Sequence, residues 1–494
     1  MSLKYMSTRG SGPLTCVEAI VKGISDDGGL YVPEKLPEID KKFSEMKDWD
    51  YRKLAEYIIG KFFPDFTEEE LKYCVDNAYD SKFTDEKIVP VVSKDKANFV
   101  ELYHGATLAF KDMALSILPY FTTTSLKKLD QKEELVILTA TSGDTGKAAL
   151  EGFKDVEGTK IIVFYPESGV SQVQERQMIT TEGNNTFVVG IEGNFDDAQN
   201  GVKEAFSNEK FNKELKEKGF MLSSANSINI GRLVPQVVYY VFGYLNLLKE
   251  GKIEEGDKIN VVVPTGNFGN ILAGYYAKQM GVPIDRLITA SNENNVLYDF
   301  FTTGKYDRNR ELKLTISPSM DILISSNLER LLYEMSGKDA SKVRDLMESL
   351  SSEGVYEVDS KIRENMKDFY GNYASEEETQ ETIREVYRKY GYVIDTHTAV
   401  AYNVYQKYLK DTGDDKETLI ISTASPFKFT RSVADALDIE TEGKTDFELI
   451  YELSDKTGLD IPGSIYKIEE KEIRHENTCK KDEMKEEIKQ LLNV

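Results

Sequence analysis

Residues 134–166 read ELVILTATSGDTGKAALEGFKDVEGTKIIVFYP, in which two apolar runs, 134–140 and 160–166, flank a polar loop and a helical stretch. Short runs that are hydrophobic throughout are typical of parallel strands covered by helices on both faces. The alternation of such runs with helical stretches predicts an α/β fold with doubly wound, mostly parallel sheets. Four further runs of the same kind lie at 186–191, 258–264, 286–291 and 418–423.

Amphipathic stretches lie between these runs. Residues 196–206 and 270–280 carry apolar side chains at helical spacing and are predicted as crossover helices. In doubly wound sheets, ligands bind beyond the carboxyl ends of the strands. The loops that directly follow the six apolar runs are therefore the expected location of the chemistry.

The composition is that of a globular, acidic protein. The 494 residues include 62 Lys and Arg against 85 Asp and Glu, which gives a formal net charge of −23. Hydrophobic residues make up 40% and charged residues 30% of the chain, a balance that excludes disorder. Phosphate backbones are held by basic surfaces, so nucleic acid is excluded as a partner and a small-molecule substrate is expected.

The cysteines and the N-terminus give an expectation about the compartment. Cys16, Cys74 and Cys479 are too widely spaced in the sequence for a disulfide framework or a Cys/His metal cluster, so no metal site is predicted. The first residues carry charges and no apolar run of signal-peptide length, and no run of 18 apolar residues occurs. We therefore expect a cytoplasmic protein with no membrane partner.

The length corresponds to about three domains of roughly 150 residues. Residues 1–95 are predicted as a mainly helical N-terminal domain, 96–250 as a smaller α/β domain and 251–494 as a larger one. A charge-dense stretch at about 340–390 is predicted as a solvated helical insertion, and the last 15 residues as a closing helix.

The segment FVELYHGATLAFKDMALSIL (99–118) predicts a strand, a short loop and a helix with Lys111 in its first turn. The partial positive charge of a helix N-terminus disfavours an ammonium and should lower the pKa of this lysine. A neutral amine is what Schiff-base chemistry requires. The alternative for this segment alone is a lysine whose stem reaches solvent.

The segment TATSGDTGKAAL (139–150) predicts a strand end, a polar loop and a helix start. Hydroxyl groups and free backbone N–H groups at a helix N-terminus suit a phosphate or a carboxylate. GDTGK resembles the end of a P-loop, but Thr141 and Ala148 stand where a P-loop needs Gly and Ser or Thr, so nucleotide binding is rejected. A capped turn without a ligand remains the alternative.

The segment KINVVVPTGNFGNILAGYYAKQM (258–280) carries Gly266 and Gly269 between a strand and a helix. Two glycines at this spacing allow a positive φ and a close backbone approach, so that several N–H groups can converge on one phosphate. Only the GxxG part of the dinucleotide fingerprint is present. A plain tight turn is the alternative.

Two weaker segments complete the set. SSANSINIGRLVPQ (223–236) places an arginine, which suits bidentate phosphate recognition, near a strand end and a helix start, although a surface arginine is the alternative. LIISTASPFKF (419–429) places Thr423 at the end of a buried strand, where its hydroxyl could face a ligand. Of the three histidines, His104 and His397 could be functional.

Taken together, these segments resemble threonine synthases, which are pyridoxal-phosphate enzymes with the tryptophan-synthase-like fold. The resemblance implies fold type II, in which two α/β domains flank the cofactor. One departure is Ala106, where the family usually carries proline. The matching motifs, in chain order, are STRGSGPLTCVEAIVKGISDDGGLYVPE (7–34), HGATLAFKD, TATSGDTG, NSINIGRLVPQ, PTGNFGN, DTHTAVAY and STASPFKF.

The resemblance also implies a role for each motif. Lys111 would form the Schiff base with pyridoxal 5′-phosphate and act as the catalytic base, and the Thr423 hydroxyl would meet the pyridine nitrogen. The cofactor phosphate would be bound by Gly266, Asn267, Phe268, Gly269 and Asn270. The substrate carboxylate would be bound by Ser142, Gly143, Asp144 and Thr145, and the substrate phosphate by Asn226, Ser227 and Arg232.

The activity that the resemblance implies is conversion of O-phospho-L-homoserine and water into L-threonine and phosphate. Another lyase of the same fold, such as a serine or threonine dehydratase, is the nearest alternative, and a catalytically silent cofactor or metabolite sensor is a second. Members of the family occur as monomers and as dimers, so both states are expected.

Overall fold

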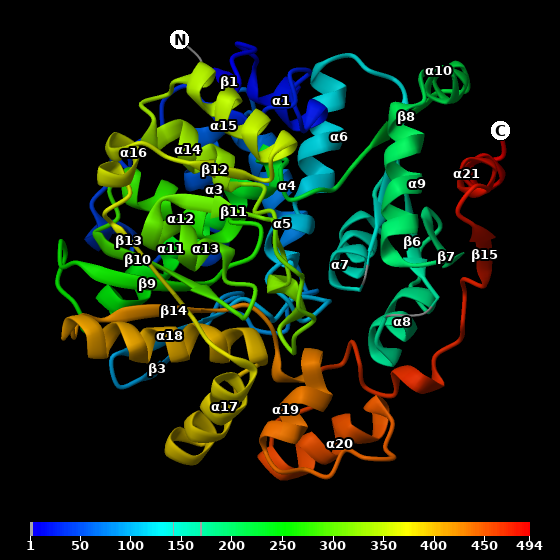
Figure 1. Ribbon diagram of the computed structural model, residues 1–494. Helices are drawn as coiled ribbons and strands as arrows, with labels where there is room; N and C mark the ends of the chain where they lie inside the picture. Colours follow the sequence, from blue (N-terminus) through cyan, green and yellow to red (C-terminus); the bar gives the residue numbers. More distant parts are fainter. Residues whose placement is uncertain (1–2, 142, 168–169) are drawn as a thin grey trace.

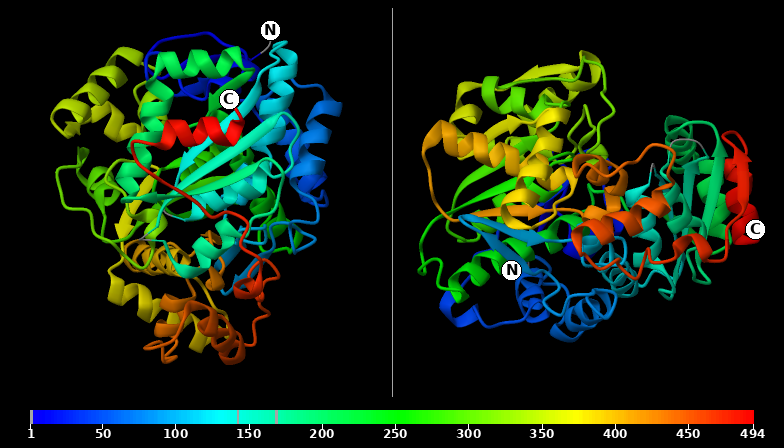
Figure 2. Two further views of the ribbon diagram at one scale, coloured as in Figure 1. Left: turned by 90° about the vertical axis from the view of Figure 1, so that its right-hand side faces the viewer. Right: turned by 90° about the horizontal axis from the view of Figure 1, so that it is seen from below.

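The computed structural model describes residues 3–141, 143–167 and 170–494. In this part of the chain, two main sheets form the centres of two lobes that lie side by side (Figures 1 and 2). Each sheet carries helices on both faces, and the predicted fold of doubly wound, mostly parallel sheets is confirmed. Two short antiparallel pairs join β1 (Tyr5–Ser7) to β2 (Tyr31–Pro33) and β11 (Lys305–Asp307) to β12 (Val355–Glu357).

The larger sheet has six strands in the order β13-β10-β9-β14-β4-β3, all parallel except for the antiparallel β3–β4 pair. The central strands β9 and β14 are buried at every position, which explains their apolar sequences. The strands are β3 (Val91–Lys94), β4 (Ala97–Glu101), β9 (Ile259–Pro264), β10 (Ile284–Ser291), β13 (Phe369–Tyr373) and β14 (Thr418–Ser422).

The smaller sheet has five parallel strands in the order β15-β7-β6-β5-β8. Its edge strand β15 comes from the end of the chain, which runs along this lobe as the red segment of Figure 2. The strands are β5 (Glu134–Ala140), β6 (Thr159–Pro166), β7 (Thr186–Glu192), β8 (Phe220–Ser223) and β15 (Asn477–Lys480).

Helices cover both sheets as the alternating sequence pattern predicts. On the smaller sheet, α7 (Asp144–Phe153) and α8 (Gln172–Ile179) lie on one face, and α9 (Phe195–Ser207) on the other (Figure 1). The larger sheet lies between α18 (Thr396–Thr412) and a layer that contains α11 (Ile230–Lys249), α12 (Gly269–Gln279) and α13 (Val296–Thr303). Among the described residues, none of the helices combines the length and the apolar character that a bilayer crossing requires.

The six strands predicted from apolar runs are all present, and each agrees with its prediction to within two residues at either end. The crossover helices predicted at 196–206 and 270–280 correspond to α9 and α12. Local hydrophobic patterning is sufficient for these elements because most positions of the strands and of α12 are buried, and α9 buries one face.

The N-terminal region is helical as predicted, with α1 (Cys16–Lys22), α3 (Tyr51–Phe62) and α4 (Glu68–Ala78). It does not have a separate core: Ile59 and Phe62 belong to the same hydrophobic cluster as Val261 of β9 and Leu419 of β14. The N-terminal region therefore packs on the larger lobe and becomes part of its core.

The predicted domain boundaries do not coincide with the sheets. The predicted boundary at residue 96 assigns β4 to the smaller α/β domain, but β4 pairs with β14 in the six-stranded sheet. The predicted range 251–494 assigns β15 to the larger domain, but β15 pairs with β7 in the five-stranded sheet. The N-terminal part of the chain therefore contributes a strand to the larger sheet, and the C-terminal end contributes one to the smaller sheet. A division at residues 96 and 251 assigns each of these strands to the other lobe.

The stretch at about 340–390, predicted as a helical insertion, is a mixture of helices and strands. Helices α15 (Ala340–Ser352), α16 (Ser360–Asn365) and α17 (Glu376–Tyr390) alternate with β12 and β13. β13 pairs in parallel with β10 and forms an edge of the main sheet. Its sequence, FYGNY, has no apolar run, because an edge strand is less buried than a central one.

A buried arginine fastens the N-terminal region to the larger lobe. Arg330 lies in α14 (Leu328–Met335) and is fully buried. Its Nε donates to the carbonyl of Tyr31 at 2.9 Å, and its Nη2 donates to the carbonyl of Ile228 at 2.6 Å. Its Nη1 donates to Oδ1 of Asn327, whose own Nδ2 donates to the carbonyl of Asn267. Arg330 therefore connects β2 with the residues just before α11, and through Asn327 also with the loop before α12.

We predict that Arg330→Met lowers the free energy of unfolding by about 2 kcal/mol or more, because buried acceptors lose their donors. Urea unfolding followed by circular dichroism measures the change. Arg344→Met is the matched control, since Arg344 is exposed and donates only to the carbonyl of Arg9. Equal stability of the two variants would contradict this role of Arg330.

Candidate active site

A cavity of about 270 Å³ opens where the carboxyl ends of β5, β9 and β14 approach one another. Residues from both lobes line it, as expected for a ligand site in doubly wound sheets. Of the predicted site residues that the structure describes, Gly143 and Asp144 are not in its lining; Ser142 is outside the described residues. The predicted residues that line it are Lys111, Thr145, Asn226, Ser227, Arg232, Gly266, Asn267, Phe268, Gly269, Asn270 and Thr423.

Lys111 lies in the cavity at the N-cap of α5 (Asp112–Leu115), one residue before the predicted position in the first helical turn. Burial lowers the pKa of Lys111, the charges of Lys428 and Arg232 lower it further, and the charge of Asp144 opposes them. The sequence predicts a lowered pKa for Lys111 and attributes it to the partial positive charge at the helix N-terminus. The structure gives burial as the largest cause, and the helix α5 has only four residues.

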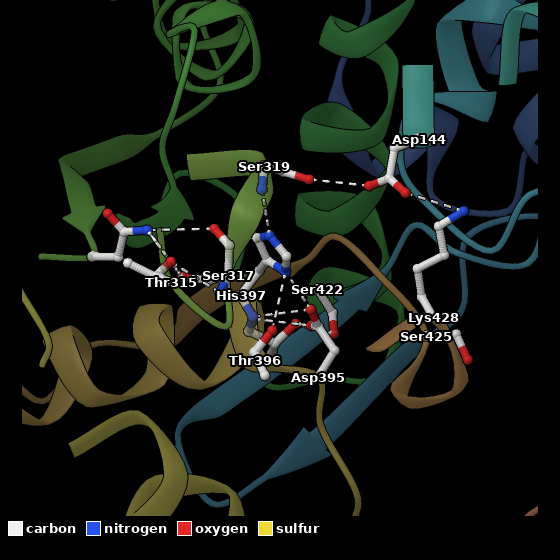
Figure 3. Close-up of polar contacts among 12 residues, drawn as sticks. Asp144, Thr315, Ser317, Ser319, Asp395, Thr396, His397, Ser422, Ser425 and Lys428 are labelled. Atoms are coloured by element: carbon white, nitrogen blue, oxygen red, sulfur yellow. Dashed lines mark hydrogen bonds and ion pairs between the residues drawn. The ribbon is translucent and has the colours of Figure 1, made fainter. Parts of the chain in front are cut away.

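Asp144, the first residue of α7, lies between two lysines, and Figure 3 shows its contact with one of them, Lys428. Its Oδ2 is 3.5 Å from Nζ of Lys111, and its Oδ1 is 3.2 Å from Nζ of Lys428. Gln174 donates to Oδ1 at 2.7 Å. Burial alone would raise the pKa of Asp144, but the charges of Lys428 and Lys111 hold it well below its usual range.

Lys428 was not predicted as a site residue. Its side chain is only 2% exposed, and Nζ donates to the carbonyl of Thr107 at 3.0 Å besides pairing with Asp144. It lies in the turn Pro426–Phe429, directly after the segment that contains Thr423. A lysine inside the apolar run PFKF is the sequence signal that could have identified it, because a lysine is rarely buried without an acidic partner.

A histidine holds the segment that faces Asp144 from the larger lobe. Nδ1 of His397 is 2.8 Å from Oδ2 of Asp395, and Nε2 accepts the backbone N–H of Ser319 at 3.1 Å. Because Nε2 is an acceptor, the ring proton lies on Nδ1 and is donated to Asp395. Ser319 in turn donates its hydroxyl to Asp144 at 3.1 Å, as Figure 3 shows. Ser319 has no sequence signal that could have identified it.

The loop before α12 has the shape of an anion site. Phe268, its N-cap residue, has a φ of 65°, and the first N–H groups of the helix have no intrahelical acceptor. The positive φ was predicted for the glycines, whereas Phe268 adopts it. Gly266 is required for another reason: a Cβ there would lie 2.6 Å from the carbonyl oxygen of Ser319.

Arg232 is a buried cation without a counter-ion. It lies in the first turn of α11 and is 5% exposed; Nη1 donates to the carbonyl of Ala225, and Nε has no hydrogen-bond partner among the residues that the structure describes. No carboxylate in the described part of the chain forms an ion pair with it, and burial lowers its pKa to about 10. A buried guanidinium in this state has a charge and a donor that suit an anionic ligand.

The residues around the cavity fit pyridoxal phosphate, the cofactor that the resemblance implies. The buried amine of Lys111 suits its aldehyde, and the start of α12 suits its phosphate. Nδ2 of Asn270 is buried without a partner and lines the same cavity, so a donor is available to an anion there. The hydroxyl of Thr423, which follows β14, could meet the ring nitrogen.

We predict that Gly266→Ala weakens pyridoxal phosphate binding by about tenfold or more, because the added methyl group pushes the loop away from Ser319. Absorbance titration of the cofactor-free protein measures the dissociation constant. Gly463→Ala is the control, since a Cβ at Gly463 meets no atom within 4 Å. Unchanged affinity in Gly266→Ala would show that the loop does not bind the cofactor phosphate.

The sequence matches three family descriptions in order along the chain. Residues 4–79 match "Threonine synthase N terminus", residues 99–424 match "Pyridoxal-phosphate dependent enzyme" and residues 398–487 match "Threonine synthase, C-terminal". The threonine synthase of Schizosaccharomyces pombe is 35% identical over 512 residues, which cover 94% of this chain and 98% of that protein.

A solved structure shows the same arrangement. The structure of pyridoxal-phosphate-bound threonine synthase from Brucella melitensis is similar over 100% of both chains, with a TM-score of 0.89 and 33% identity. Threonine synthase-like 1 of Pongo abelii is 39% identical over 457 residues, which cover 90% of this chain. This chain spans 60% of that relative's length. The chain belongs to the threonine synthase family of pyridoxal-phosphate-dependent enzymes.

Proposed function

We propose that the protein is a threonine synthase, which converts O-phospho-L-homoserine and water into L-threonine and phosphate, the last step of threonine biosynthesis. The observation that carries this proposal is Arg232, a buried guanidinium without a counter-ion in the same cavity as Lys111. A substrate with a phosphate group supplies the missing anion. The similarity to proteins named threonine synthase supports the same reaction.

Two groups of residues would bind the cofactor and the substrate. When bound, pyridoxal phosphate supplies an electron sink that makes the Cα and Cβ protons of the substrate acidic. Lys111 would hold it covalently, the loop Gly266, Asn267, Phe268, Gly269 and Asn270 would bind its phosphate, and Thr423 would face its ring nitrogen. Asn226, Ser227 and Arg232 would bind the substrate phosphate.

The start of α7 would bind the substrate carboxylate through backbone N–H groups of the loop Ser142, Gly143, Asp144 and Thr145 and through the hydroxyl of Thr145, which lines the cavity. The carboxylate of Asp144 would repel that of the substrate if its charge were free. Because Lys428 and Lys111 both lie beside the carboxylate of Asp144, they offset its charge. Asp144 would then orient the amines of these two lysines.

Lys111 would carry the protons of the reaction. Burial lowers the pKa of its amine, which favours the neutral form that a general base needs. Because one amine holds only one extra proton, it would take the proton from Cα, release it, and then take one from Cβ, after which the Cγ–O bond breaks and the phosphate leaves toward Arg232. Water would add its oxygen to Cβ and give one proton to the departing phosphate. Lys111 would then deliver one proton to Cγ and one to Cα, which balances the two that it removed.

The nearest alternative is another fold type II lyase, such as a serine or threonine dehydratase. It would use the same lysine and cofactor loop, but its substrate has no phosphate, so a buried guanidinium without a counter-ion would have no role. Initial rates with O-phospho-L-homoserine, O-phospho-L-serine and L-threonine distinguish the two. Production of 2-oxobutyrate from L-threonine, without turnover of O-phospho-L-homoserine, would establish the dehydratase.

We predict that Lys111→Ala reduces threonine formation by at least about 10³-fold, because both the cofactor attachment and the base are lost. The visible absorbance of the lysine-bound cofactor should disappear with the activity. Lys132→Ala, which changes an exposed lysine, should keep both. Threonine formation by Lys111→Ala at a comparable rate would refute the role of this lysine.

We predict that Arg232→Met lowers kcat/KM for O-phospho-L-homoserine by about 10- to 100-fold, since a charged hydrogen bond to phosphate is worth roughly 1.5–3 kcal/mol. The loss should be smaller for the unphosphorylated analogue L-homoserine, measured as an inhibitor. Equal losses of affinity for both compounds would mean that Arg232 supports the fold and does not bind the substrate phosphate.

A further inference from the structure

A second cavity, of about 220 Å³, lies outside the active site and shares no lining residue with it. It is lined by residues of α7, α8 and the segment 464–471, which includes the turn Ile468–Glu470. In Figure 1 this segment runs from α20 (Asp446–Thr457) past α8 toward β15. The cavity therefore lies where the C-terminal segment passes over the smaller lobe.

The floor of this cavity contains polar atoms with no partner. Gln177 is 2% exposed, and neither its Nε2 nor its Oε1 has a hydrogen-bond partner in the structure. The hydroxyl oxygen of Ser464, which also lines the cavity, is buried and unpartnered in the same way. Buried amides are almost always hydrogen-bonded, because an unmet donor or acceptor costs roughly 1–3 kcal/mol. These atoms indicate an occupant that both accepts and donates hydrogen bonds.

The walls of the cavity carry charges of both signs. Lys147 forms an ion pair with Glu151 and donates to Thr181 at 2.8 Å, so its charge is already compensated. At the rim, Lys154 is 3.4 Å from Glu182, and Lys471 forms no ion pair within the described part of the chain. A simple anion would face the glutamates and a simple cation would face the lysines. A ligand with one charge of each sign can place its negative group near the lysines and its positive group near the glutamates, so that neither group faces a like charge.

We propose that this cavity is a second binding site, which takes a small zwitterionic α-amino acid. The ligand carboxylate would lie toward Lys471, and its ammonium toward the glutamates and Oε1 of Gln177. A volume of about 220 Å³ is far more than one water needs and is similar to that of the active-site cavity, so a small organic molecule fits. The proposal goes beyond the proposed reaction and does not depend on it.

The cavity is connected to the active site through one short loop. Ala106 lines the cavity, and the carbonyl of the next residue, Thr107, accepts the hydrogen bond from Lys428. Lys147 lies one helical turn after Asp144 in α7. An occupant that moves Ala106 or Lys147 can therefore shift the Lys428–Asp144 ion pair through Thr107 or along α7, and its effect on turnover should not be competitive with the substrate.

Calorimetric titration of the full-length, cofactor-loaded protein with the neutral L-α-amino acids tests the proposal. We expect that at least one of them shows a binding event that weakens by about tenfold or more in Gln177→Met, which removes the amide at similar side-chain size. The same event should weaken in Lys471→Ala, whose side chain is exposed, so this change leaves the core intact. Gln131→Met, at an exposed glutamine, is the matched control and should bind like the unmodified protein.

Acetate, inorganic phosphate and ethylamine are the probes that carry charge of one sign only. None of them should reproduce the binding event. Binding that persists unchanged in both Gln177→Met and Lys471→Ala belongs to the active site and would overturn the proposal. Equally tight binding of acetate or phosphate, with the same dependence on Lys471, would also overturn it and identify a simple anion site.

Discussion

The arrangement of the active site depends on the carboxylate of Asp144, which lies between the Nζ atoms of Lys111 and Lys428. Asp144 belongs to the smaller lobe, while the two lysines follow β4 and β14, neighbouring strands of the larger sheet. Two buried ammonium groups placed side by side would repel each other and lose hydration. One carboxylate between them offsets both charges, so the same contact joins the two lobes and keeps the reactive amine in place.

The cavity is electropositive although the chain as a whole is strongly acidic. Lys111, Lys428 and Arg232 outnumber Asp144 around it, whereas the net charge of the protein is −23. At physiological ionic strength, charges separated by more than about 8 Å through solvent are largely screened. Binding of anionic ligands is therefore decided by the few buried donors in the cavity, and the acidic surface has little influence on it.

Much of the fold could be predicted from the sequence, because its central strands are short apolar runs and its loops follow them directly. The same logic placed most of the predicted residues around one cavity, since parallel strands present their carboxyl ends at one edge. β13 and β15 could not be predicted in this way, because edge strands lack the apolar run that identifies a central strand.

The contacts within the site were less predictable than its location. Ser319 lies 208 residues from Lys111 in the sequence and reaches it only through the fold. Lys428 belongs to a motif that was recognised, but its burial beside Asp144 is a property of the assembled lobes. The unpartnered amide of Gln177 likewise becomes visible only when the C-terminal segment covers α8.

In the proposed reaction, the Cγ–O bond of a phosphorylated substrate breaks and water adds at Cβ. The most direct test is to incubate the cofactor-loaded protein with O-phospho-L-homoserine in ¹⁸O-labelled water and to analyse both products by mass spectrometry. We expect equal amounts of phosphate and threonine, with the label in the threonine hydroxyl and none in the phosphate. Label in the phosphate, or formation of 2-oxobutyrate in place of threonine, would contradict it.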